Sequence, residues 1–150
     1  MKLATALMNR SELQKKIDEL HTRLNLNAKV QEGEAPAEQP EELLAELDAA
    51  SAELEELVTR INLTNAQTVT DGQTMTARIA HRDTLMKKQR ILRSFLDEAS
   101  NLASRYSRTE IKIQSTVNVR AMQKQLDAVA QEIRLTDEKL QELNWTVELI

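Results

Sequence analysis

The stretch from Thr76 to Tyr106 constrains the fold most, because it is the longest helical pattern in the chain and its apolar stripe changes width along it. Around Arg82 the stripe is narrow, and around Phe95 it is wide. The wide half holds Leu92, Phe95, Leu96, Ala99, Leu102, Ala103 and Tyr106. The narrow half is strongly basic and contains Arg78, His81, Arg82, Lys87, Lys88, Arg90 and Arg93. Such a helix needs a hydrophobic partner for its wide half and an acidic or solvated surrounding for its narrow half.

Three further segments, at about residues 2–27, 41–65 and 118–147, show the same helical spacing of apolar residues. The first seam consists of Leu3, Ala6, Leu13, Ile17, Leu20 and Leu24. The second consists of Leu43, Leu47, Ala50, Leu54, Leu57 and Ile61. The last consists of Val119, Met122, Leu126, Val129, Ile133, Leu140, Leu143 and Val147, with Thr136 as an interruption. Sustained seams of this kind are typical of helices that pack on other helices.

Arg10 stands in the row of apolar residues of the first segment. A lone charge on a seam usually extends its charged end to solvent or pairs with a neighbouring side chain. The alternative is that Arg10 sets the register or the oligomeric state, as buried polar residues do in coiled coils.

The composition agrees with helices and not with sheets. The 150 residues include two glycines, two prolines and 2% aromatic residues, whereas strands are enriched in aromatic and β-branched side chains. We therefore predict an all-α fold of four long antiparallel helices, at about residues 2–27, 41–65, 76–106 and 118–147, in one domain over residues 1–150. The helices are expected to form a bundle or helical hairpins.

The connections differ from one another. Residues 28–40 hold both prolines and one glycine, which predicts an acidic loop. Asp71-Gly72 between short Thr-rich runs predicts a small β-hairpin, with a plain polar turn as the alternative. Alternating residues around Ile111 and Ile113 predict a short extended segment near Glu110–Gln114, after which Asn118 is suited to cap the last helix.

An up-and-down order of helices makes further predictions. The acidic loop and the segment from Arg105 to Lys112 are expected at one end, and the N-terminus, Asp71-Gly72 and Asn144-Trp145 at the other. The acidic second helix is the expected neighbour of the basic third helix.

Charge and composition argue against several classes of protein. A net charge of −4 and few aromatic residues argue against a dedicated nucleic-acid binder. The absence of cysteine excludes disulfides and thiolate chemistry and fits a reducing compartment. The apolar run at the N-terminus ends at Asn9 and Arg10, too early for a signal peptide, and no segment approaches the roughly 20 apolar residues of a membrane span. We therefore expect a cytoplasmic protein that does not bind membranes.

One cluster of polar residues is a candidate binding site. Arg105, Tyr106, Ser107, Arg108 and Lys112 stand where the third helix is expected to end. Arginine forks and hydroxyl groups bind carboxylates and phosphates through charge-assisted hydrogen bonds. Glu32, Glu34 and Glu38 are equally suitable partners, which would make the cluster an internal or intersubunit staple. An exposed face without a partner is the third alternative.

Catalytic and metal sites receive little support. Asp18 and His21 have the spacing of a di-iron carboxylate-histidine pair, but no second pair exists, since Arg78 stands three residues before His81. Glu53 and Glu56 have a spacing suited to Mg²⁺, but the third helix offers no matching acidic pair on its apolar side. We predict no catalytic residue, no metal and no cofactor.

The chain resembles the septicolysin-like family of bacterial helical proteins of unknown function. Four segments carry the likeness: Asn27–Glu34, Arg60–Asn65, Arg105–Lys112 and Leu143–Thr146. The resemblance implies a compact, helical, oligomeric and cytoplasmic protein without catalytic residues.

Long seams with few aromatic residues are better served by partner helices than by one small core. The leading hypothesis is therefore a self-associating interaction or scaffold module, a homodimer or a higher oligomer up to a hexamer. Trp145 is expected at a helix end or a subunit contact. The competing hypothesis is a protein that binds a small anion or a nucleotide at Arg105–Lys112, with or without a weak enzymatic activity.

Overall fold

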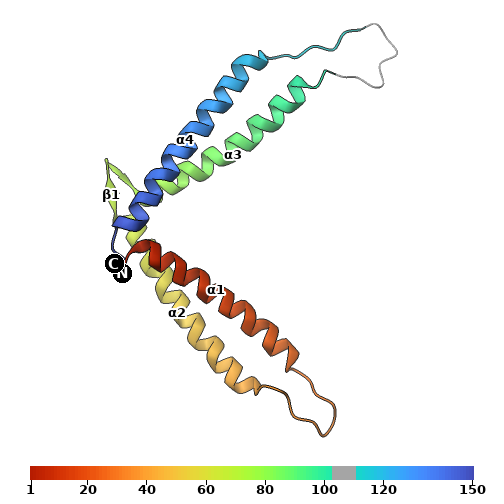
Figure 1. The fold of residues 1–150 in the computed structure, drawn as a ribbon, viewed down its shortest axis with the longest axis vertical. Coiled ribbons are helices and arrows are strands. Elements are labelled where there is room, and N and C mark those ends of the chain that lie inside the picture. Colours follow the sequence, from red (N-terminus) through yellow and green to blue (C-terminus); the bar gives the residue numbers. More distant parts are fainter. Residues whose placement is uncertain (103–110) are drawn as a thin grey trace. The chain divides into compact units, whose positions relative to one another are not determined.

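A computed structural model describes residues 1–102 and 111–150 (Figure 1). The elements are α1 (Leu3–Leu26), α2 (Pro40–Gln67), β1 (Val69–Thr70), β2 (Gln73–Thr74), α3 (Met75–Ser100) and α4 (Val119–Thr146). The prediction of a mainly helical fold with four long helices and one small β-hairpin is confirmed. Across the described ranges, no helix has the length and apolar character needed to cross a membrane.

The chain forms two compact units. One contains Met1–Thr74 and Leu143–Ile150, and the other contains Met75–Glu142. The first unit is built on the hairpin of α1 and α2, and the second on the hairpin of α3 and α4 (Figure 1). One bundle domain over all 150 residues therefore stays a prediction. The expectation that the acidic loop and the segment from Arg105 to Lys112 lie at one end also stays a prediction.

The seam between α1 and α2 is the core of the first hairpin. Leu20 and Leu43 are almost fully buried, and Ala50 lies in the same cluster. Ile17, Leu24 and Leu47 pack against that cluster. These residues recur every three or four positions, so each helix turns one apolar stripe towards the other. The chief helical partner of α2 is thus α1.

The second hairpin has a thinner and more polar seam. Leu85 and Leu96 of α3 are buried, as are Leu126, Val129 and Leu140 of α4. The two helices are also joined by an ion pair, since Arg82 Nη1 lies 3.1 Å from Asp137 Oδ1. His81 Nε2 lies 2.8 Å from Glu132 Oε1. Because Arg82 lies beside the apolar stripe, the narrow half of α3 is held to α4 partly by polar contacts.

Helix ends follow the local sequence. Pro40 opens α2 and is followed by Glu41 and Glu42 in the first turn, where the fixed φ of proline and negative charge both favour a helix N-terminus. Asn118 precedes α4, and its Oδ1 accepts a hydrogen bond from the backbone N–H of Ala121 at 3.0 Å. The predicted cap by Asn118 is confirmed.

The predicted β-hairpin is also confirmed. Val69 pairs with Thr74 and Thr70 with Gln73 in antiparallel register. Asp71 and Gly72 form the turn with φ values of 52° and 75°. Positive φ at both central residues defines a type I′ turn, which explains why Asp-Gly occurs here.

The predicted length of the third helix is wrong. We expected a helix to Tyr106, but α3 ends at Ser100, and Asn101 and Leu102 lie outside it. Arg82 and Asp137 contact each other across the antiparallel pair of helices. Ala99 follows Arg82 by as many residues as Arg120 precedes Asp137, so Ala99 lies level with Arg120, next to the first residue of α4. Beyond that level α4 offers no surface, and a helical turn without tertiary packing is weakly stable. Residues 111–115 belong to no helix or strand, and Glu110 lies outside the described residues.

The α1–α2 seam gives a test of the fold. Replacing Leu20, which is 0% exposed, by Ala should lower the free energy of unfolding by about 2–5 kcal/mol, because it removes buried methyl groups and leaves a cavity. Urea unfolding followed by circular dichroism measures the change. Leu26→Ala is the matched control, since Leu26 is 76% exposed and its loss should change stability by less than about 0.5 kcal/mol. Equal losses in both variants would contradict the seam.

Candidate functional site

The broad apolar half of α3 is only partly covered. Leu96 is buried and Leu92 and Ala99 are half-buried, so these residues face the seam with α4. Phe95 remains 45% exposed and Ile91 61% exposed. A single antiparallel neighbour covers one stripe of a helix, and Ile91 and Phe95, four residues apart, lie together outside that stripe.

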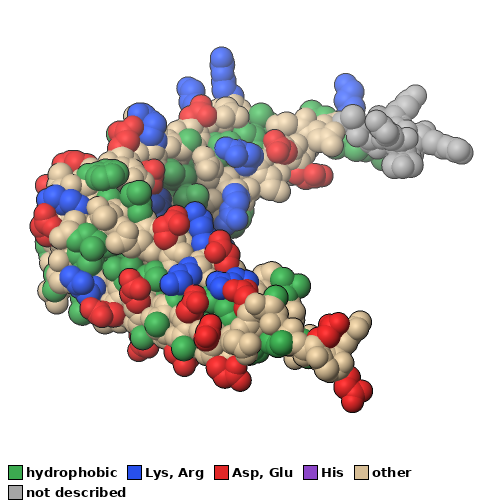
Figure 2. Space-filling view, turned by 60° about the horizontal axis from the view of Figure 1, so that its bottom comes forward, with side chains coloured by type: hydrophobic (Ala, Val, Ile, Leu, Met, Phe, Trp, Pro, Cys, Tyr) green, Lys and Arg blue, Asp and Glu red, His purple; other side chains and the backbone are tan. Residues whose placement is uncertain are grey.

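Further apolar side chains continue this surface beyond the end of α3. Leu102 is 50% exposed and Ile113 is 53% exposed. We call Ile91, Phe95, Leu102 and Ile113 the α3 tip face. Figure 2 shows hydrophobic side chains at the surface of the unit that leads to the grey residues.

Two adjoining hollows lie on the α3 tip face, and both are lined by Phe95 and Glu98. One has a volume of about 510 Å³ and is also lined by Arg90, Ile91 and Ser94. The other has a volume of about 260 Å³ and extends over Ala99, Asn101, Leu102 and residues 113–116. The surface is therefore shallow and mixed in polarity, which suits contact with another helix better than capture of a small molecule.

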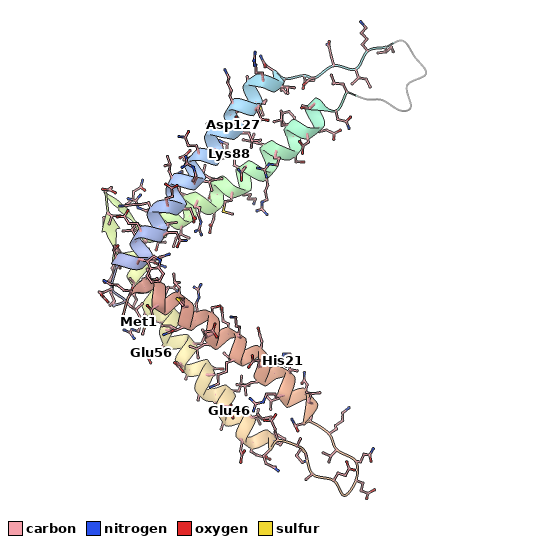
Figure 3. The ribbon with its side chains drawn as sticks, in the orientation of Figure 1. Met1, His21, Glu46, Glu56, Lys88 and Asp127 are labelled. Atoms are coloured by element: carbon pink, nitrogen blue, oxygen red, sulfur yellow. The ribbon has the colours of Figure 1, made fainter. Side chains whose placement is uncertain are left out.

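Cationic side chains surround the apolar part of α3. Lys87, Lys88, Arg90 and Arg93 are exposed, and Lys88 is labelled on α3 in Figure 3. None of these four forms an ion pair with another residue within ranges 1–102 and 111–150. Their positive charges are therefore available to a partner.

Arg82, by contrast, is already neutralised. It lines a groove of about 400 Å³ between α3 and α4, with Met86, Ile133 and Asp137 among the other lining residues. Its Nη2 donates a hydrogen bond to Asp83 at 3.0 Å, and its Nη1 donates one to Asp137 at 3.1 Å. Partial burial lowers the pKa of Arg82, but the hydrogen bonds to Asp83 and Asp137 outweigh this effect and raise it. The groove therefore offers no free cation from Arg82 to a bound anion.

The predicted anion site is mostly outside the described residues. Arg105, Tyr106, Ser107 and Arg108 all fall within 103–110. Lys112 is exposed and lies in the irregular segment before α4. Glu32 and Glu34 are exposed in the loop between α1 and α2. Both the staple and the anion site stay predictions.

Glu38, a third expected partner of that cluster, is held by Arg23 instead. Arg23 Nε donates a hydrogen bond to Glu38 Oε2 at 3.0 Å, and Arg23 Nη1 lies 3.8 Å from Glu46 Oε2. Asn27 Oδ1 also accepts a hydrogen bond from the Glu38 backbone N–H at 3.0 Å. The hydrogen bond from Arg23 lowers the pKa of the Glu38 carboxyl group. Arg23 and Asn27 thus tie the acidic loop to the end of α1.

The two ends of the chain form a second polar cluster, which joins the N-terminus to the residues that follow Asn144-Trp145. Lys2 Nζ lies 2.7 Å from Glu148 Oε1, and the Met1 amino group lies 3.0 Å from Glu148 Oε2. The backbone N–H of Leu3 donates to the Val147 carbonyl at 2.9 Å, and that of Leu149 to the Met1 carbonyl at 2.8 Å. The hydrogen bond from Lys2 is the main cause of the lowered pKa of Glu148. The up-and-down order of helices predicted that the N-terminus and Asn144-Trp145 share one end, but no short-range sequence pattern indicates which side chains meet there.

The C-terminal residues also reach α2. The backbone N–H of Ile150 donates to Thr64 Oγ1 at 3.1 Å, and Arg60 Nε donates to the Ile150 carbonyl at 2.7 Å. Thr64 is fully buried, so this contact satisfies its hydroxyl group. Trp145 lies in the last turn of α4, at the predicted helix end, and is 60% exposed.

Arg10 lies half-buried in α1 between buried Ala6 and Leu13. Its Nε is buried and has no hydrogen-bond partner. A buried donor without a partner costs free energy. Arg10 therefore lowers the stability of the first hairpin, whereas Arg82 is hydrogen-bonded in the second. A role of Arg10 in register or oligomeric state stays a prediction.

Metal-binding side chains do not gather anywhere along the described ranges. No group of three or more His, Asp or Glu there stands close enough to hold an ion. His21 is exposed on α1, and His81 contacts Glu132.

The two seam arginines should respond oppositely to removal. Arg10→Met should raise the free energy of unfolding by about 1 kcal/mol, because the unpaired buried donor disappears while the apolar stem is retained. Arg82→Met should lower it, because the contacts with Asp83 and Asp137 are lost. Chemical denaturation of both variants measures the difference. A loss of stability in Arg10→Met would show that Arg10 has a favourable partner.

The Arg23–Glu38 contact makes stability depend on pH. The pKa of Glu38 is lower in the folded chain than its ordinary value of 4.5, so its contribution is present above pH 4.5 and is lost as the pH falls through the lowered value. Glu38→Gln should therefore be less stable than the natural chain at pH 7, and the difference should shrink on acidification below 4.5. Urea unfolding across this pH range measures it. Glu34→Gln, an exposed change in the same loop, is the control and should show no such difference at any pH.

Comparisons with known proteins give a family whose function is unknown. A family model described as a family of unknown function (DUF6847) matches residues 10–149. A crystal structure of a functionally unknown conserved protein from Corynebacterium diphtheriae is 41% identical, with a TM-score of 0.91. The alignment covers 100% of this chain and 99% of that chain. A comparison with curated proteins gave no match. The chain belongs to the DUF6847 family of unknown function.

Proposed function

We propose that this protein is a helical interaction module that associates with copies of itself and acts through protein contacts, without catalysis. The observation that carries the proposal is the α3 tip face, where Ile91 and Phe95 stay exposed beside a seam that buries Leu96. The proposal includes a cytoplasmic location and coiled-coil-like contacts between chains. The septicolysin-like resemblance supports it, because it implies an oligomeric protein without catalytic residues.

Energetics support a partner for this surface. Full burial of a Phe or Ile side chain contributes about 1.5–3 kcal/mol. Phe95 is the single phenylalanine of the chain, and nearly half of its surface remains in contact with water. Aromatic side chains are enriched among residues that dominate protein interfaces. Packing a second helix along Ile91 and Phe95 would therefore bury apolar surface of both residues that the isolated hairpin leaves exposed, and this burial would stabilise the association.

A polar substitution at the centre of the α3 tip face tests the proposal. Phe95→Asp should weaken self-association by about tenfold or more, because it replaces an apolar contact by a charge that must be desolvated. Light scattering coupled to size exclusion, over a range of protein concentrations, measures the mass.

Leu135→Asp is the matched control. Leu135 is 52% exposed on α4 and is not among the residues of the α3 tip face. This variant should associate like the natural chain, and circular dichroism should show both variants folded. A natural chain that remains monomeric at every concentration tested would overturn the proposal.

A further inference from the structure

We infer that the partner of the α3 tip face is the acidic outward surface of α2 in a second copy of this chain. The inference rests on the proposed self-association and adds the identity of the two surfaces. Both surfaces are exposed, and they carry opposite charges that are left unpaired among the described residues.

The outward surface of α2 is strongly acidic. It consists of Glu41, Glu42, Asp48, Glu53, Glu55 and Glu56, all exposed. None of these forms an ion pair with another residue in ranges 1–102 and 111–150. Arg60 is the one basic residue of α2, and its Nε is already bonded to the Ile150 carbonyl. The acidic charge of α2 is therefore not compensated along its own helix.

α3 presents the complementary charge. Lys87 and Lys88 precede Ile91 by about one helical turn, and Arg90 lines the same hollow as Ile91 and Phe95. Glu98 lines this hollow as well, so the cations outnumber the carboxylates around Ile91 and Phe95. The excess of cations therefore favours a partner helix that carries carboxylates beside an apolar or small-residue strip. Like charges at such a contact repel one another, so a basic helix does not fit.

α2 meets this requirement in its geometry as well. Its apolar stripe is occupied by α1, while Ala45, Ala49 and Ala52 are exposed on other positions of the helix. Glu41, Asp48 and Glu55, spaced by heptads, run along one edge of this alanine strip. Small residues let helices approach closely, so the larger Ile91 and Phe95 can pack between carboxylates. Figure 2 shows several acidic side chains on the first hairpin, and Lys and Arg side chains projecting from the second.

Charge exchange between two differently altered copies tests the inference. One variant carries Asp48→Lys and Glu55→Lys, and the other carries Lys87→Glu and Arg90→Glu. Each variant alone should associate about tenfold or more weakly, because both of its contact surfaces then carry the same sign. An equimolar mixture should regain association, because each basic surface again meets an acidic one. Analytical ultracentrifugation with one variant labelled measures the mixed species.

Matched controls carry the same charge changes elsewhere. Asp18→Lys with Glu19→Lys alters exposed positions of α1, and Arg120→Glu with Lys124→Glu alters exposed positions of α4. Both controls should associate like the natural chain. Since the chain has no cysteine, a mixture of Ala49→Cys and Ser94→Cys copies gives a second readout. Under mild oxidation, disulfide-linked pairs should form mainly between the two different copies.

The outcomes separate this inference from the proposed function. A monomeric natural chain would overturn both. Association that is abolished by Phe95→Asp but unchanged by both charge variants would overturn the inference alone and leave self-association in place. A disulfide that forms within a single chain carrying both cysteines, at dilution and without linked pairs, would place the contact inside one molecule and also overturn the inference. Association that requires added nucleic acid would also overturn the inference, because the partner of α3 would then not be α2.

Discussion

The structure depends on one constraint: two paired helices can bury only the stripe that each turns towards the other. In the first hairpin the stripes of α1 and α2 pack against each other, so Leu20 and Leu43 are almost fully buried. In the second hairpin the stripe of α3 widens towards its C-terminal end, and α4 covers only part of it. The exposure of Phe95 follows from this mismatch, because a helix has no second neighbour within a two-helix hairpin.

Ion pairs and hydrogen bonds add contacts where the apolar seams are incomplete. Arg82 enters the seam of the second hairpin and meets Asp137, whereas Arg10 enters that of the first and leaves its Nε unpaired. At the ends of the chain, Lys2 and Glu148 fasten the first turn of α1 to the residues after α4. These contacts are mostly exposed, so each contributes little free energy by itself. Their value lies in fixing which segments meet.

The proposed role in recognition agrees with this architecture. The described side chains that stand together are ion pairs and apolar seams, and the hollows over Phe95 are shallow and open to a partner. The related protein from Corynebacterium diphtheriae, a functionally unknown conserved protein, shares the fold over 99% of its length. In the proposed self-association, the opposite charges of α2 and α3 would select the partner surface, since electrostatic complementarity governs specificity more than affinity.

The sequence by itself determined the four helices, the Asp71-Gly72 turn and the cap at Asn118, because helical periodicity, positive φ and capping act over a few residues. Only the tertiary structure decided which apolar residues of α3 are covered, that α3 ends at Ser100, and that Glu38 meets Arg23. It also decided that α2 pairs with α1, although charge alone favoured α3. Each of these outcomes depends on which segments distant in the chain come together. The sequence alone does not determine which helices pair, because several of them carry apolar seams of similar spacing and any two could pack by the same rules.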